Sequence, residues 1–231
     1  MSKTIVALDF PDRKTTLDFL DDFKDPIFVK LGMELTYAEG FELIDEIKKR
    51  GHQIFLDLKL HDIPNTVKNG MKSLAKRNVD IVNLHASGGI EMMKKAIEGL
   101  EEGSKDKRPL CIAVTQLTST SKEMMNDELM IAGEVNDVVL KYAQNAKIAG
   151  LDGVVCSVHE ASLIHKVCGD DFLTVTPGIR LSGDQKDDQK RVATPEYAKN
   201  QGCDYIVVGR SITKSSNPKE TFDSIEQIME A

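Results

Sequence analysis

The 231-residue sequence lacks several patterns that would assign it to other classes of protein. No apolar stretch reaches the roughly 18 residues that a membrane-spanning helix needs, and no signal peptide precedes the first strand-like run. The four cysteines form no C-x-x-C pair and are irregularly spaced, which is typical of reduced, buried thiols in a cytosolic protein. We therefore expect a cytoplasmic protein that does not associate with a membrane.

Basic residues are also fewer than acidic residues. The chain has 30 Lys and Arg against 37 Asp and Glu, so its formal net charge is -7. An acidic balance disfavours nucleic acid and anionic membranes as partners. A small anionic ligand is still compatible with it, because a local cluster of Lys and Arg can outweigh the overall charge.

Eight short apolar runs recur along the chain, each followed by a longer amphipathic stretch. The runs are rich in Val, Ile and Leu and are nearly continuous, as buried parallel strands are. The stretches between them have helical spacing, for example Phe41, Leu43, Ile44 and Ile47, with Gly51 ending that helix. The predicted strands are Thr4–Leu8, Ile27–Lys30, Gln53–Leu58, Ile81–Leu84, Leu110–Thr115, Gly153–Val155, Leu173–Thr176 and Tyr205–Val208.

Eight such units of about 29 residues predict an α/β protein with the TIM (β/α)8 barrel fold. The competing architecture is a doubly wound open sheet, which usually has fewer strands and a glycine-rich loop after the first. Here the first strand is followed by Asp9-Phe10-Pro11, with no glycine fingerprint. Since no linker or low-complexity segment interrupts the chain, we expect residues 1–231 to form a single domain.

Charged residues gather at the carboxyl ends of the predicted strands, where such barrels carry their active sites. Asp57 and Lys59 are two apart on one strand, so they share a face, while the flanking leucines face the helices. Lys30 ends the neighbouring strand at a matching level, and buried charges need partners. Together with Asp62 from the following loop, these residues predict a catalytic array of alternating charge.

The ends of the last two strands predict a phosphate site. Gly178 and Gly209 allow backbone N–H groups to approach an anion closely, and Arg180 and Arg210 can provide charge-assisted hydrogen bonds. Ser211 is placed to cap the helix that follows. Loops after the seventh and eighth strands commonly hold phosphate in (β/α)8 barrels.

The connection between residues 181 and 194 is polar and rich in turn-forming residues, so it cannot belong to the core. A solvated surface loop would explain its composition. Its position directly after the seventh predicted strand favours a mobile lid over the site.

Patterns for metal binding and for nucleophilic catalysis are missing. His61 and His85 lie near strand ends, but neither has a second histidine at metal-ligand spacing, so we predict no metal. Ser119, Thr120 and Ser121 have no nearby base, which argues against a catalytic triad.

The segment Asp57-x-Lys59-x-x-Asp62-Ile63-Pro64-Asn65-Thr66 resembles the signature of the orotidine 5′-phosphate decarboxylase family in its short bacterial form. The resemblance implies a cofactor-independent lyase that converts orotidine 5′-phosphate to UMP and CO₂ in pyrimidine biosynthesis. Further blocks resemble that family in the same order across nearly the whole chain: Ala7–Asp9, Val29–Gly32, Val114–Ser119, Thr176–Arg180 and Val207–Arg210.

This resemblance also implies roles for individual residues. Lys59 would donate the proton to C6 of the pyrimidine, and Asp57 would lie against the carboxylate that is lost. Asp62 and Thr66 would reach the site of the neighbouring subunit, so a homodimer with shared sites is expected. The remaining substrate contacts would be Asp9 and Lys30 to the ribose, Thr118 and Pro177 to the base, and Arg180, Gln189, Gly209 and Arg210 to the phosphate.

Two rival interpretations differ in chemistry. Magnesium-dependent sugar-phosphate enzymes of the same superfamily, such as hexulose-phosphate synthase or keto-gulonate-phosphate decarboxylase, share an Asp-x-Lys-x-x-Asp core. The segment Ile63–Thr66 and the long connection with Gln189 favour the nucleotide enzyme. A catalytically inactive barrel that serves as a binding protein is disfavoured, because unused buried charges are costly to keep.

Overall fold

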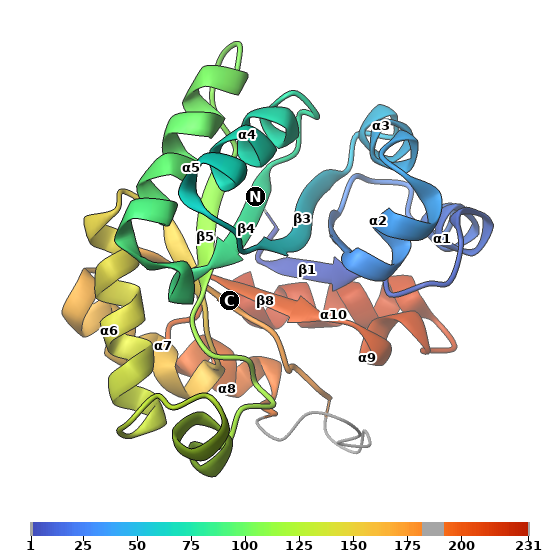
Figure 1. Cartoon of the computed structure of the whole chain (residues 1–231). Coiled ribbons are helices and arrows are strands. Elements are labelled where there is room, and N and C mark those ends of the chain that lie inside the picture. The colour runs from blue at the N-terminus through green and yellow to red at the C-terminus, as the bar shows by residue number, and fades with distance from the viewer. Residues whose placement is uncertain (1, 182–191, 231) are drawn as a thin grey trace.

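The computed structural model describes residues 2–181 and 192–230. Eight parallel strands form a closed barrel in which each strand pairs with its neighbours in sequence and β8 pairs with β1 (Figure 1). The predicted (β/α)8 barrel is therefore confirmed. The strands are β1 (Thr4–Ala7), β2 (Phe28–Gly32), β3 (Gln53–Leu60), β4 (Ile81–His85), β5 (Leu110–Val114), β6 (Gly153–Val155), β7 (Leu173–Thr176) and β8 (Tyr205–Val208).

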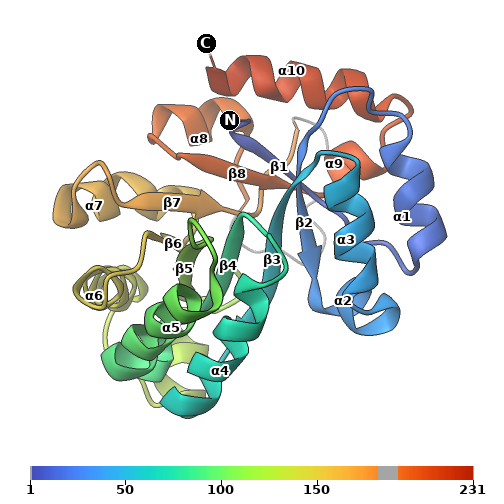
Figure 2. The same cartoon turned by 90° about the horizontal axis from the view of Figure 1, so that it is seen from above.

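Helices lie outside the ring of strands, as the view from above shows (Figure 2). None of those in the described part of the chain has both the length and the apolar character that a membrane crossing requires. They are α1 (Arg13–Leu20), α2 (Met33–Glu39), α3 (Glu42–Lys49), α4 (Pro64–Ala75), α5 (Gly89–Gly103), α6 (Val135–Ile148), α7 (Val158–Cys168), α8 (Pro195–Asn200), α9 (Arg210–Thr213) and α10 (Pro218–Glu230), with short turns at η1 (Ala86–Gly88) and η2 (Met124–Glu128).

The eight predicted strands are all present, and their ends differ from the predicted ones by no more than two residues. Gly51 ends α3, as expected. Gly51 and Gly150, which follows α6, have φ angles of 88° and 85°, a left-handed conformation that favours glycine.

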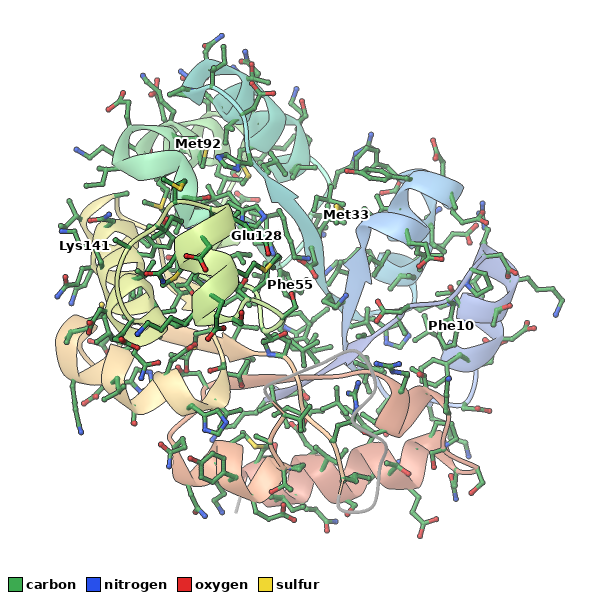
Figure 3. The ribbon with its side chains drawn as sticks, turned by 60° about the horizontal axis from the view of Figure 1, so that its bottom comes forward. Phe10, Met33, Phe55, Met92, Glu128 and Lys141 are labelled. Carbon is green, nitrogen blue, oxygen red and sulfur yellow. The ribbon has the colours of Figure 1, made fainter. Side chains whose placement is uncertain are left out.

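The barrel has two separate apolar layers, because side chains alternate between the two faces of each strand. One layer lies between strands and helices. The other fills the barrel interior, where Figure 3 shows Phe55 near the middle of the molecule. The interior layer consists of Ile5, Ala7, Phe28, Phe55, Ile81, Ile112, Val175 and Val207. A barrel filled in this way leaves the ends of the strands as the place for a cavity.

Helices α4 and α5 pack unusually closely. A Cβ atom added to Gly99 would lie 2.1 Å from the carbonyl oxygen of Lys68, so only glycine fits at this crossing. Lys68 also forms ion pairs with Glu98 and Glu102. This packing fixes the position of α4. Its first turn and the loop before it contain residues 62–66 of the segment that resembles the family signature.

Candidate functional site

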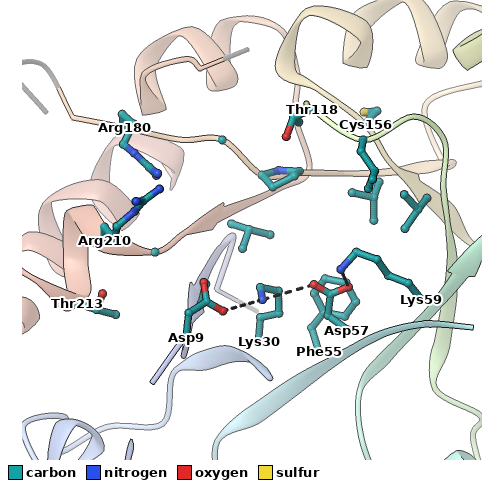
Figure 4. A pocket seen from close by; sticks show the side chains of 18 of the residues that line it. Asp9, Lys30, Phe55, Asp57, Lys59, Thr118, Cys156, Arg180, Arg210 and Thr213 are labelled. Atoms are coloured by element: carbon teal, nitrogen blue, oxygen red, sulfur yellow. Dashed lines mark hydrogen bonds and ion pairs between the residues drawn. The ribbon is translucent and has the colours of Figure 1, made fainter. Parts of the chain in front are cut away.

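A cavity of about 570 Å³ opens at the carboxyl ends of the strands, the end that the sequence predicted to carry the site (Figure 4). Its size suits a small-molecule ligand. Ten of the predicted site residues line it: Asp9, Lys30, Asp57, Lys59, Thr118, Pro177, Gly178, Arg180, Gly209 and Arg210.

At one side of the cavity, four charged residues of alternating sign form a chain. Lys30 Nζ lies 3.2 Å from Asp9 Oδ1 and 3.4 Å from Asp57 Oδ2, and Lys59 Nζ lies 2.7 Å from Asp57 Oδ1. Each buried charge thus has an opposite charge beside it. Leu56 points to the other face of β3 and is buried against the helices, as the two-residue period of a strand predicted.

Asp57 is the most buried member of this chain, with 8% of its surface exposed. Burial alone would raise the pKa of its carboxyl group. The positive charges of Lys30 and Lys59, with hydrogen bonds from Lys59 and Asn83, outweigh burial and lower this pKa below its usual range. Asp57 is therefore a carboxylate at neutral pH, and it forms an ion pair with Lys59.

The other side of the cavity carries two guanidinium groups. Arg180 follows β7 and Arg210 begins α9, and their side chains point toward each other (Figure 4). Arg180 is 8% exposed, and its Nε has no hydrogen-bond partner among the described residues. Since a buried donor is costly to leave unpaired, this geometry favours an anion between the two arginines.

Between the two charged sides, the cavity wall is mostly apolar. Val155, Val207 and Phe55 form part of it, together with Pro177, and Thr118 adds a hydroxyl group. This combination suits a flat ring with a few polar substituents.

The strand-end rule missed part of the cavity lining. It did not single out Gln116, and it gave no signal for residues that reach the cavity from neighbouring loops and helices. These additional lining residues include Phe10, Gln116, Cys156, Thr213 and Lys214.

Two predicted residues, Asp62 and Thr66, are not brought into the cavity by their own chain. Asp62 and Thr66 are exposed and do not line it, and Asp62 Oδ1 accepts a hydrogen bond from the backbone N–H of Ile63. The array therefore does not include Asp62 within one chain. Gln189 and most of the predicted lid lie outside the described residues.

The histidines and cysteines near the cavity form no metal-binding group. His61 and His85 have ring centroids 5.7 Å apart, and burial lowers the pKa of His85, with a further contribution from His61. Within residues 2–181 and 192–230, no cluster of three or more His, Cys, Asp or Glu could hold a metal ion. The four cysteines are buried, and none of them forms a disulfide.

Comparison with known protein families gives a match over nearly the whole chain. The model of the orotidine 5′-phosphate decarboxylase / HUMPS family matches residues 2–225. Among curated proteins, an orotidine 5′-phosphate decarboxylase of Bacillus cytotoxicus is 57% identical over 231 residues, covering 98% of this chain and 97% of the relative. One from Bacillus cereus is 57% identical over 226 residues, covering 96% and 95%.

Two solved structures are also similar to this chain over nearly its whole length. The crystal structure of orotidine 5′-phosphate decarboxylase from Lactobacillus acidophilus has a TM-score of 0.91 and 42% identity, with all of both chains covered. That of an uncharacterized conserved protein from Geobacillus kaustophilus has a TM-score of 0.89 and 48% identity, covering 98% of this chain and 99% of the other.

Proposed function

The chain belongs to the orotidine 5′-phosphate decarboxylase / HUMPS family, and we propose that it uses Lys59 as the proton donor when it converts orotidine 5′-phosphate to UMP and CO₂. The reaction is a carboxy-lyase step of pyrimidine biosynthesis. One observation carries the assignment of roles: the alternating chain of Lys30, Asp57 and Lys59 faces a cavity whose opposite side presents two converging arginines.

The substrate fits the cavity with its phosphate at the arginine side. Arg180 and Arg210 bind the phosphate, with Gly209 allowing a close approach of the backbone, and Gln189 is expected to join them. Asp9 and Lys30 hydrogen-bond the ribose hydroxyl groups. The pyrimidine then lies against the apolar wall beside Thr118 and Pro177, with its C6 atom turned toward Asp57 and Lys59.

Proton donation by Lys59 solves the main difficulty of the reaction. Loss of CO₂ leaves an electron pair at C6 that the π system of the ring cannot delocalise well. An ammonium group held beside C6 stabilises this negative charge as it develops and then transfers its proton to the carbon. Asp57 holds this ammonium group in place by an ion pair, with Lys59 Nζ 2.7 Å from Asp57 Oδ1.

Asp57 has a second role at the carboxylate that leaves. Its pKa is lowered, so it stays ionised beside the negatively charged substrate carboxylate. The resulting repulsion is relieved when CO₂ departs. Binding energy from the remote phosphate holds the substrate in this position despite the repulsion.

The exposed positions of Asp62 and Thr66 support a homodimer with shared sites. Both are missing from the cavity of their own chain, although they belong to the segment that resembles the family signature. In a two-fold dimer they complete the array of the partner subunit, where Asp62 adds a second carboxylate near Lys59. The scheme requires no cofactor, and we place the enzyme in the cytoplasm.

The direct test of this function is product formation from orotidine 5′-phosphate. Purified protein should release UMP and CO₂ in equal amounts. Consumption of the substrate without CO₂ release would contradict a decarboxylase.

Shared sites predict complementation between two inactive variants. Lys59→Ala and Asp62→Ala chains that exchange subunits should form hybrid dimers with one intact site. If half of the dimers are hybrids, about a quarter of wild-type activity should return, because each hybrid has one working site of two. Activity is measured after exchange is confirmed by mass spectrometry of differently tagged chains.

The control is each variant exchanged with itself, which should stay inactive. If confirmed exchange restores no activity, Asp62 does not act across the subunit boundary.

A further inference from the structure

One buried amide lies in the barrel wall next to the two residues that carry the proposed chemistry. Asn83 stands in the middle of β4 and has none of its surface exposed. Its neighbours Val82 and Leu84 pack against the helices, so Asn83 points to the barrel interior, as Ile81 does. A polar side chain in such a place costs free energy unless it is hydrogen-bonded.

The hydrogen bonds of Asn83 reach both Asp57 and Lys59. Its Nδ2 donates to Asp57 Oδ1 over 2.7 Å, and its Oδ1 accepts from the backbone N–H of Lys59 over 2.8 Å. The same oxygen of Asp57 accepts a hydrogen bond from Lys59 Nζ over 2.7 Å. A single carboxamide therefore holds the side chain of one residue and the backbone of the other.

An irregularity in β3 explains why a side chain is needed here. Between Leu56 and Leu60, β3 advances four residues while β4 advances two, so the regular pairing of the strands is interrupted. Lys59 lies in this bulge with a φ angle of 50°, which is unfavourable for a residue with a Cβ atom. Asn83 Oδ1 provides the acceptor that a backbone carbonyl would supply in a regular ladder.

We propose that Asn83 is a positioning residue, whose carboxamide holds Lys59 in its left-handed backbone conformation and Asp57 in its rotamer. The ammonium group of Lys59 is thereby fixed at one place in the wall of the cavity. Asn83 is not among the residues that line the cavity, so it acts through Asp57 and Lys59. The inference rests on the proposed roles of these two residues.

Two substitutions separate positioning from general stability. Asn83→Leu is of similar size and removes both hydrogen bonds. Asn83→Asp keeps the shape and the acceptor, but when ionised it cannot donate and it places a second carboxylate beside Asp57. Both should lower kcat by about 100-fold, because a small misplacement of a reacting group is costly. The Kd for UMP should stay within about fivefold of wild type, because phosphate and ribose contacts are intact.

Thr174→Val is the matched control at the opposite end of the barrel. Thr174 is also fully buried, and its Oγ1 donates to a carboxylate oxygen of Asp204 over 2.9 Å. This variant should lose thermal stability, as the Asn83 variants should, but keep near wild-type kcat.

The pH dependence of Asn83→Asp gives a readout that a structural role would not change. Two adjacent carboxylates share a proton more readily than either would bind one alone. Once protonated, the introduced carboxyl group can donate to Asp57 and accept from Lys59, as the amide does. The ratio of variant to wild-type kcat should therefore rise by about tenfold from about pH 8 to about pH 5.

The proposal is overturned if folded Asn83 variants keep kcat within about fivefold of wild type, or if kcat and UMP affinity fall in parallel. A pH-independent ratio for Asn83→Asp would also overturn it, and this test holds even if Asn83→Leu does not fold. Lys59→Ala, assayed beside them, separates the two hypotheses. If that variant stays active, the proposed role of Lys59 is wrong; if it is inactive while Asn83 variants are active, only the role of Asn83 is wrong.

Discussion

Replacing Lys59 with alanine is expected to lower kcat for orotidine 5′-phosphate by at least about 10⁴-fold, since the variant loses both the cation beside C6 and the proton donor. The Kd for UMP should change by no more than about tenfold, because the arginine side of the cavity is untouched. Decarboxylation is followed by loss of substrate absorbance, and UMP binding by calorimetry.

Lys14→Ala is a suitable control for this experiment. Lys14 lies on α1 and forms an exposed ion pair with Asp18, outside the cavity. It should retain wild-type turnover. Turnover by Lys59→Ala close to that of the control would mean that another group protonates C6.

Replacing Arg210 with alanine is expected to lower kcat/KM for orotidine 5′-phosphate by about 10³-fold, because a charge-assisted contact to the phosphate is lost. The same substitution should change kcat/KM for orotidine, which has no phosphate, by no more than about threefold. The difference between the two substrates measures how much of the phosphate binding energy is used to reach the transition state.

Arg50→Ala provides the matched arginine control. Arg50 pairs with Asp21 at a distance of 2.6 Å and does not line the cavity. Its removal should leave both substrates unaffected. Equal losses on both substrates for Arg210→Ala would remove Arg210 from the phosphate site.

Much of the fold could be predicted because each strand of a (β/α)8 barrel is buried on both faces. Continuous apolar runs such as Tyr205–Val208 then stand out from the amphipathic helices around them. Alternation along β3 also placed Asp57 and Lys59 on one face. The strand-end rule further predicted that two arginines from different loops share a cavity with them.

The bulge in β3 and the part played by Asn83 could not be predicted in this way. Strand periodicity assumes a regular ladder, whereas Lys59 adopts a left-handed conformation that depends on contacts with β4. A signal was nevertheless present, because Asn83 is a polar residue inside an apolar strand. Such a residue needs a buried partner, and the adjacent strand carried the charged pair.

The role of Asp62 also could not be predicted from the residue pattern of a single chain. Its spacing from Lys59 suggested a single array, but its own chain leaves it exposed, away from the cavity. Periodicity describes one strand or helix and carries no information about a neighbouring subunit. Only the family resemblance suggested that Asp62 acts across a dimer interface.

The central claim is that this cavity decarboxylates orotidine 5′-phosphate through its own charged side chains. The most direct measurement is the loss of substrate absorbance with purified enzyme, in the presence and absence of a chelator such as EDTA. We predict rapid loss of absorbance at the same rate in both samples. No turnover, or turnover that the chelator abolishes and added magnesium restores, would contradict the claim.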